Sequence, residues 1–146
     1  MIRGACIKNI EIHTQMLKYA ECQNRKNNKG KIMKRYLGRS GIEISALGMG
    51  CWAIGGPFWA DKTPLGWGEV DDSESIRAIH TAIDNGVNFF DTANVYGAGH
   101  SERVLGQALS GRRSQVVIAT KFNAVFDETS RQVTGDDATP DGIRKA

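Results

Sequence analysis

Long apolar runs and paired cysteines are both scarce in this chain of 146 residues. No apolar run approaches the roughly 20 residues that a membrane-spanning helix needs, so no membrane insertion is expected. The three cysteines are Cys6, Cys22 and Cys51, and no two of them have CxxC spacing. An odd, sparse set of cysteines without a secretory apolar segment is typical of a reducing, cytoplasmic location rather than of a disulfide-stabilised scaffold.

A basic surface is also lacking over most of the chain, although the formal net charge is +3. Residues 1–32 contain seven of the 19 Lys and Arg residues and two of the 16 Asp and Glu residues, a balance of +5. Residues 33–146 therefore contain 12 basic and 14 acidic residues, a balance of −2. Because the basic excess lies in the leading segment, the remainder has no nucleic-acid footprint.

Residues 1–32 form a basic leader that differs in composition from the rest of the chain. They contain one aromatic residue, Tyr19, and a polar run over residues 23–31. We favour the hypothesis that Met33 is the true start, since residues 29–31 can be encoded by a purine-rich sequence of the kind that binds ribosomes before a start codon. A disordered basic arm is the alternative. A transit peptide is disfavoured, because the segment contains two Glu and no Ser.

From Met33 onward the length suits one domain, and its pattern predicts strands that alternate with helices. Residues 34–37 and 43–45 flank a Gly-rich turn and predict a β-hairpin. Short apolar runs predict strands over residues 47–52, 87–91 and 116–121. Residues 55–68 and the polar stretch after Lys121 are expected to be loops.

Three helix starts are marked by capping residues. Asp71 precedes an acidic first turn, and the inward stripe of this first helix is Ile76, Ile79 and Ile83. Asn85-Gly86 suits its end. Ser101 opens a second helix, whose expected inward residues are Val104, Leu105, Ala108 and Leu109. Thr139-Pro140-Asp141 opens a third. Repeated βα units with short apolar strands predict an α/β fold with a parallel sheet covered by helices.

Gly48-Met49-Gly50-Cys51-Trp52-Ala53 matches the G-x-G-x-x-A dinucleotide fingerprint in form only. That motif needs a helix that starts at the glycines, so that the helix N-terminus meets the pyrophosphate. The residues that follow, Ile54-Gly55-Gly56-Pro57, do not propagate a helix. The sequence therefore does not predict a Rossmann-type site here.

Asp91, Tyr96 and Lys121 are the candidate catalytic residues. Asp91 and Lys121 end two consecutive apolar runs, and the carboxyl ends of parallel strands meet at one edge of a sheet, where α/β proteins place their sites. A Lys ammonium beside a phenol favours the phenolate and lowers the pKa of the Tyr, while a carboxylate keeps the Lys charged and oriented. This trio can deliver a proton to a developing alkoxide.

The histidines, the tryptophans and Cys51 could take part in chemistry or binding, but each also has a structural explanation. His100 is interpreted as a residue at a helix start and His80 as a flank residue of the first helix. Cys51 is interpreted as an inert buried thiol. The tryptophans near the site either line an apolar substrate pocket or pack a long loop; they are Trp52, Trp59 and Trp67.

The residues quoted above resemble the aldo-keto reductase family. The match extends over residues 33–146, and its most specific part is Phe89-Phe90-Asp91-Thr92-Ala93-Asn94-Val95-Tyr96-Gly97, followed by Ser101-Glu102. Residues 34–41 resemble the family's opening hairpin, 47–52 its first strand and 117–121 the strand that bears its lysine. The resemblance implies the N-terminal portion of a (β/α)8 TIM barrel, with about three βα units after the hairpin.

The resemblance also implies a function. Members reduce aldehydes and ketones to alcohols with NADP(H), and small carbonyl compounds are the substrates. Tyr96 would then be the general acid, Lys121 would lower its pKa and Asp91 would hold Lys121. Gly50, Cys51 and Trp52, together with Asp91, would lie by the cofactor or the substrate mouth. No metal is implied.

One departure from the family bears on activity. The family's catalytic histidine and most of its phosphate contacts lie on later strands than those present here, and three strands cannot close a barrel. We therefore expect a fragment that is poorly stable, aggregation-prone and nearly inactive alone. Two alternatives remain open: a non-catalytic regulatory subunit, a role that this barrel has in some potassium channels, and a half-barrel that needs a partner chain.

Overall fold

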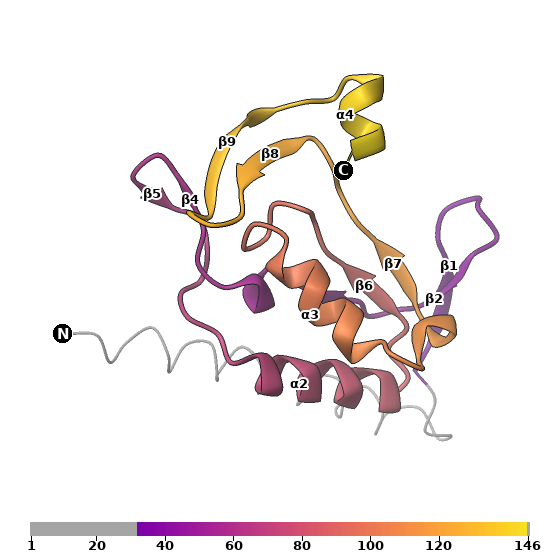
Figure 1. The fold of residues 1–146 in the computed structure, drawn as a ribbon. Coiled ribbons are helices and arrows are strands. Elements are labelled where there is room, and N and C mark those ends of the chain that lie inside the picture. The colour runs from indigo at the N-terminus through magenta and orange to yellow at the C-terminus, as the bar shows by residue number, and fades with distance from the viewer. Residues whose placement is uncertain (1–31, 146) are drawn as a thin grey trace.

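The computed structural model describes residues 32–145 (Figure 1). The prediction for the leader over residues 1–32 therefore falls outside the described residues, except at Ile32. That side chain is half-buried and packs against the core.

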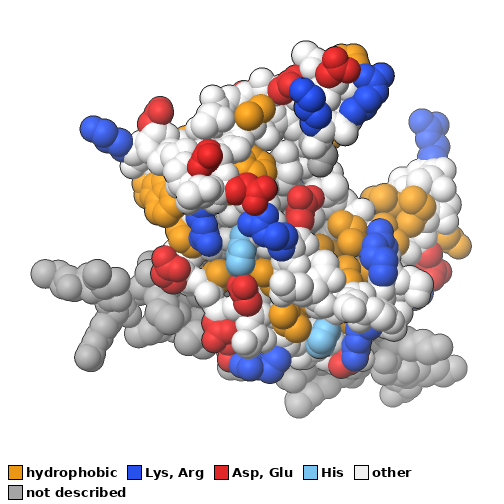
Figure 2. Space-filling view, viewed as in Figure 1, with side chains coloured by type: hydrophobic (Ala, Val, Ile, Leu, Met, Phe, Trp, Pro, Cys, Tyr) orange, Lys and Arg blue, Asp and Glu red, His pale blue; other side chains and the backbone are white. Residues whose placement is uncertain are grey.

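The predicted hairpin is confirmed. Strands β1 (Lys34–Tyr36) and β2 (Glu43–Ser45) pair antiparallel, with Arg35 opposite Ile44. Its turn is closed by a hydrogen bond from the Leu37 amide to the Ile42 carbonyl oxygen at 2.9 Å. Apolar side chains gather on the surface of this hairpin (Figure 2), and those that are exposed in and beside it are Met33, Tyr36, Leu37 and Ile42.

The predicted parallel sheet is also present, with strands in the order β3-β6-β7. Its strands are β3 (Met49–Gly50), β6 (Phe89–Asp91) and β7 (Val117–Ala119). Each strand starts one or two residues later than predicted, and β3 and β7 also end two residues earlier. Hydrogen bonding nevertheless continues one residue further: Cys51 N donates to Asp91 O and Thr92 N donates to Ala119 O, both at 2.8 Å.

Helices α2 (Asp72–Asp84) and α3 (His100–Ala108) cover one face of this sheet and pack against each other (Figure 1). Asp71 caps α2 as predicted, since its Oδ1 accepts from the amides of Ser73 at 2.8 Å and Glu74 at 3.1 Å. Asn85 is the residue after the helix, and Gly86 follows with a left-handed φ of 89°. Helix α3 starts at His100, one residue before the predicted Ser101.

The core lies between the sheet and these two helices. Ile79 of α2 and Phe90 of β6 are fully buried at its centre. The residues predicted to face inward from α3 are all buried: Val104, Leu105, Ala108 and Leu109. The other face of the sheet is only half-buried, and its residues include Phe89 and Val117, which lie opposite each other in register.

A second, four-stranded sheet was not predicted. Its strands are β4 (Trp59–Ala60), β5 (Thr63–Pro64), β8 (Ala124–Asp127) and β9 (Gln132–Asp136), in the order β5-β4-β9-β8. The prediction of loops over residues 55–68 and after Lys121 was therefore wrong. Each segment is a hairpin, and β4 pairs with β9 in parallel, so the two segments stabilise each other across a long sequence separation.

The remaining elements are short. Two 3₁₀ turns, η1 (Ala53–Gly55) and η2 (Arg113–Gln115), precede the loop to β4 and strand β7. Helix α4 (Pro140–Lys145) begins where predicted, and the Gly142 amide donates to Thr139 Oγ1 at 3.1 Å. Within residues 32–145, no helix has the length and apolar character that crossing a membrane requires. The observed architecture is α/β, with strands and helices that alternate along the chain.

Candidate functional site

The three candidate catalytic side chains meet at the carboxyl edge of the parallel sheet. Asp91 is the last residue of β6, Tyr96 lies in the loop between β6 and α3, and Lys121 lies two residues beyond β7. About half of the Asp91 and Lys121 side-chain surface is exposed, at 42% and 51%. The site is therefore accessible to a small molecule.

Lys121 Nζ is the centre of the site. It donates to the Asp91 carboxylate, through a contact with Oδ1 and one of 3.0 Å with Oδ2. It also donates to the Thr92 carbonyl oxygen at 2.8 Å and to Tyr96 Oη at 3.3 Å. An ammonium has three hydrogens and no lone pair. The Tyr96 phenol must therefore accept from Lys121, which leaves its own proton available for another acceptor.

The same contacts keep Lys121 charged. Desolvation alone would lower the pKa of the Lys121 ammonium, but the hydrogen bonds with Asp91 and Tyr96 and the charge of Asp91 outweigh it, so the pKa is raised. A raised pKa means that Lys121 is a cation across the neutral range. A fixed positive charge thus lies beside the Tyr96 phenol.

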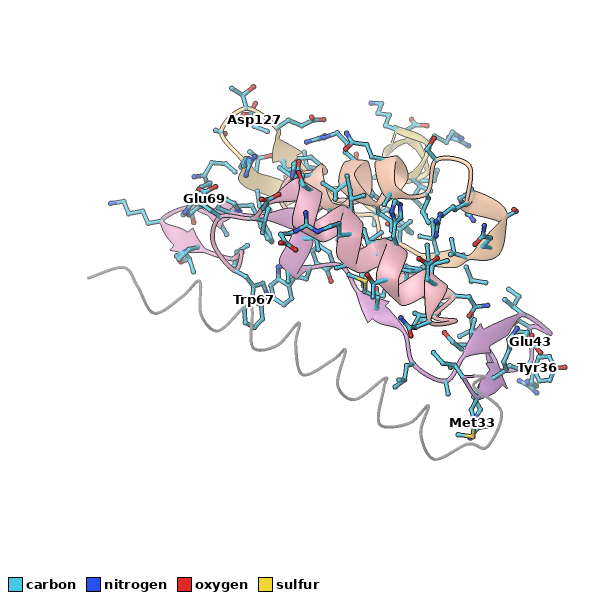
Figure 3. All side chains as sticks on the ribbon, turned by 90° about the horizontal axis from the view of Figure 1, so that it is seen from below. Met33, Tyr36, Glu43, Trp67, Glu69 and Asp127 are labelled. Carbon is cyan, nitrogen blue, oxygen red and sulfur yellow. The ribbon has the colours of Figure 1, made fainter. Side chains whose placement is uncertain are left out.

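An aromatic surface flanks the phenol. The Trp52 ring stacks on the Tyr96 ring with centroids 5.6 Å apart and planes at 11°. Trp67 meets Trp52 edge-on at 6.2 Å. Figure 3 shows Trp67 well away from the hairpin residues Met33 and Tyr36. Trp59, by contrast, belongs to the second sheet.

The backbone of the Tyr96 loop packs tightly against η1. Gly97 has a φ of 63°, and a Cβ added there would lie 1.7 Å from the Gly55 carbonyl oxygen. A Cβ at Gly55 would lie 2.8 Å from the carbonyl carbon of Tyr96. Only glycine at both positions permits this approach. This contact was not predicted from the sequence, in which the two glycines themselves are its only signal.

Behind the site lies a buried pair of hydroxyl groups, which were also not predicted from the sequence. Ser101 Oγ donates to the Cys51 carbonyl oxygen at 2.7 Å and lies 3.0 Å from Thr92 Oγ1. Ser101 is 0% exposed and Thr92 is 2% exposed. A carbonyl oxygen can only accept, so the single hydroxyl proton of Ser101 is used there. Thr92 must therefore be the donor to Ser101.

Asn94 connects the Tyr96 loop to the segment that carries Lys121. Its amide N–H donates to the Lys121 carbonyl oxygen, and its Nδ2 donates to the Ala124 carbonyl oxygen, each at 3.1 Å. Asn94 was not singled out from the sequence beyond its place in the Phe89–Gly97 motif. No local pattern could have indicated these partners, which lie about 30 residues away.

The residues predicted to lie near a cofactor are at the end of β3. Cys51 is fully buried, and its pKa is raised to about 12, chiefly by burial and further by the charge of Asp91, against the opposing effect of Lys121. The thiol is therefore protonated at neutral pH, which favours the inert interpretation. Gly50 is exposed, and a Cβ added to it would meet nothing within 4 Å.

The two histidines in the described part of the chain have hydrogen-bond partners outside the candidate trio. His100 Nε2 lies 2.8 Å from Asp72 Oδ1, so it joins the starts of α3 and α2. His80 Nε2 lies 2.8 Å from the Ala108 carbonyl oxygen, at the end of α3. Both have structural roles, as their positions in the sequence indicate.

Comparisons with known proteins point to one family. The model of the aldo/keto reductase family matches residues 46–146. The aldo-keto reductase YhdN of Bacillus subtilis is 44% identical over 84 residues, which are 56% of this chain and 23% of that protein. The aldo-keto reductase AMT2 of Alternaria alternata is 43% identical over 97 residues, which are 64% of this chain and 25% of that protein. The chain thus spans about a quarter of the length of these relatives.

Solved structures agree with this result. The holo form of the aldo-keto reductase AKR11C1 from Bacillus halodurans superposes with a TM-score of 0.63 at 28% identity, over 78% of this chain and 33% of that one. The glycerol dehydrogenase AKR11B4 from Gluconobacter oxydans superposes with a TM-score of 0.58 at 38% identity, over 77% of this chain and 32% of that one.

Proposed function

This chain belongs to the aldo/keto reductase family, and we propose that it carries the proton-donating part of an NADP(H)-dependent site that reduces aldehydes and ketones to alcohols. The observation that carries the proposal is the placement of Lys121 Nζ between the Asp91 carboxylate and the Tyr96 hydroxyl. The substrate is a small carbonyl compound, and the location is the cytoplasm.

The proton comes from Tyr96. Because Lys121 donates to the phenol oxygen, the phenolic proton is available to a substrate carbonyl oxygen that approaches from the exposed side. As that oxygen becomes an alkoxide, it takes the proton, and the O–H bond of Tyr96 breaks. The Lys121 ammonium stabilises the phenolate that remains, and Asp91 holds the ammonium in place.

The residues at the end of β3 fit the nicotinamide part of NADP(H), which supplies a hydride when bound. Gly50 leaves open space where a side chain would stand, and Trp52 presents an aromatic ring that is 42% exposed. The Cys51 side chain is buried, so only its backbone would contribute. We propose Gly50, Cys51, Trp52 and Asp91 as the residues of this chain that hold the cofactor.

We further propose that the chain of 146 residues is nearly inactive alone. It spans about a quarter of the length of its curated relatives, and the sheet face with Phe89 and Val117 is only half-buried. A partner chain that covers this face is the alternative route to activity.

The test compares two proteins. One is the chain itself, and the other is a chimera in which residues 33–146 replace the corresponding segment of Bacillus subtilis YhdN. Oxidation of NADPH with an aldehyde is followed by its absorbance. We expect negligible turnover for the chain and measurable turnover for the chimera.

In the chimera, Tyr96→Phe removes the proton donor and is expected to lower kcat by on the order of 10²- to 10⁴-fold. Tyr36→Phe is the matched control, because Tyr36 is 68% exposed on β1, remote from the site. If both variants turn over like the parent chimera, Tyr96 is not the general acid and the proposal fails.

A further inference from the structure

A serine behind the site adds a side-chain connection between its two halves, beside the backbone hydrogen bond from Cys51 N to Asp91 O. One half is the end of β3, where Cys51 precedes the Trp52 that stacks on Tyr96. The other is the end of β6, where Asp91 and the Thr92 carbonyl oxygen both accept from Lys121. The two halves come from segments 40 residues apart, and Ser101 of α3 contacts both through its hydroxyl group.

The direction of the hydrogen bonds makes the connection specific. Lys121 donates to the Thr92 carbonyl oxygen, the Thr92 hydroxyl donates to Ser101 Oγ, and Ser101 donates to the Cys51 carbonyl oxygen. Ser101 must therefore accept one hydrogen bond and donate another. Alanine can do neither, and it would leave the Thr92 hydroxyl and the Cys51 carbonyl oxygen without this partner in the buried surroundings behind the site.

Burial makes the connection rigid. Ser101 and Cys51 are both 0% exposed and Thr92 is 2% exposed, so no solvent competes for these groups. In surroundings of low polarity a satisfied hydrogen-bond chain is stronger than its counterpart in water. The Thr92 main chain, and with it the third acceptor of the Lys121 ammonium, is held against α3 and β3 at the same time.

We propose that Ser101 is a positioning residue for the proton donor. It touches no reacting atom, and it fixes the distance between Lys121 and Tyr96 by tying Thr92 to Cys51. The catalytic meaning of this role rests on the proposed function, whereas the geometric role can be tested without it.

The first readout is geometric and uses the chimera described above, because the chain alone is expected to self-associate. Lys121 Nζ lies 5.0 Å from the Tyr96 ring centroid, so a nuclear Overhauser effect is expected between the Lys121 methylene protons and the ring protons. Ser101→Ala is expected to weaken this effect by about threefold if the separation grows by about 1 Å, because its intensity falls with the sixth power of distance. Contacts within α2 should not change.

Ser75→Ala is the matched control. Ser75 is also a buried helix serine, and its Oγ donates to the Asp71 carbonyl oxygen at 3.0 Å, but it lies in α2, away from the site. Thr92→Val keeps the shape of Thr92 and removes its hydroxyl group. It should have the same effect on the Lys121–Tyr96 contact as Ser101→Ala, and the double variant should weaken that contact no further, since either change breaks the connection from Thr92 through Ser101 to Cys51.

The second readout is turnover in the chimera described above. Ser101→Ala is expected to lower kcat by up to about 100-fold with little change in KM, since misplacement impairs the chemical step more than binding. Ser75→Ala should leave kcat unchanged. Should Ser101→Ala leave both kcat and the Lys121–Tyr96 contact as in the parent, the inference is wrong. If the parent chimera shows no turnover while the contact still depends on Ser101, the proposed function fails and the positioning role stands.

Discussion

At the scale of single residues, the site depends on side chains whose hydrogen-bonding groups are all in use, so that substitution would break a contact. Lys121 uses its three hydrogens on three groups, and Ser101 uses its hydroxyl group in both directions. Gly97 is equally intolerant of substitution, because its left-handed φ and its contact with Gly55 each exclude a side chain. The Tyr96 loop is therefore positioned by packing as well as by hydrogen bonds.

Gly97→Ala is expected to lower the free energy of unfolding by at least about 1 kcal/mol, because the new Cβ would strain the backbone and meet the Gly55 carbonyl oxygen. Gly106→Ala is the control. Gly106 lies in α3 with nothing within 4 Å of an added Cβ, so this change should stabilise the helix by about 1 kcal/mol. Denaturant unfolding measures both, and equal effects would contradict the close approach.

At the scale of elements, helix α2 begins where its capping residue, Asp71, predicts. Asp71 accepts from two amides at the helix start, and these hydrogen bonds hold the pKa of its carboxyl group below its ordinary value. A lowered pKa means that the charged carboxylate stabilises the folded state above the ordinary pKa of an aspartate. This stabilisation is lost as the pH falls through the lowered value.

Asp71→Ala is therefore expected to be less stable than the parent at neutral pH, with a deficit that shrinks below about pH 3.9. Asp71→Asn is the control, since its side-chain oxygen still caps the helix but does not titrate. Thermal unfolding followed by circular dichroism at several pH values measures the difference. A deficit that is the same at pH 7 and at pH 2 would show that the charge of Asp71 does not matter.

At the scale of the whole molecule, one face of the parallel sheet is covered by helices and the other is only half-buried. Strands β3 and β7 are the edges of this sheet within residues 32–145, and apolar side chains are exposed around the β1–β2 hairpin (Figure 2). Half-covered sheets with open edges tend to pair with other copies. These features favour self-association of the chain.

The chain of 146 residues is expected to associate increasingly with concentration and to unfold over a broad temperature range. Sedimentation velocity at several concentrations and calorimetry measure these properties. A single monomeric species with a sharp, cooperative transition would contradict the expectation, and it would show that the half-buried sheet face is tolerated in water.

Local signals account for much of the agreement between sequence and structure. The hairpin, the parallel strands and the three helix starts were predicted because caps, turns and apolar periodicity involve residues that are near each other in the sequence. The second sheet was missed because the glycine-rich and polar composition of its two hairpins is typical of loops, and because the pairing of Trp59 with Gln132 that joins the hairpins spans a long stretch of sequence. In the site, the sequence predicted that Asp91, Tyr96 and Lys121 meet, since strand ends converge at one edge.

The sequence by itself determined the order of the first hairpin, the three parallel strands and the helices, the family resemblance, and the identity of the proposed acid and its lysine. Only the tertiary structure decided how the Lys121 hydrogens are shared, that Gly55 and Gly97 are in contact and that Ser101 joins Thr92 to Cys51. The physical reason is distance along the chain. Ser101 and Cys51 are 50 residues apart, and a hydrogen bond between such positions depends on the packing of whole elements, which no local pattern specifies.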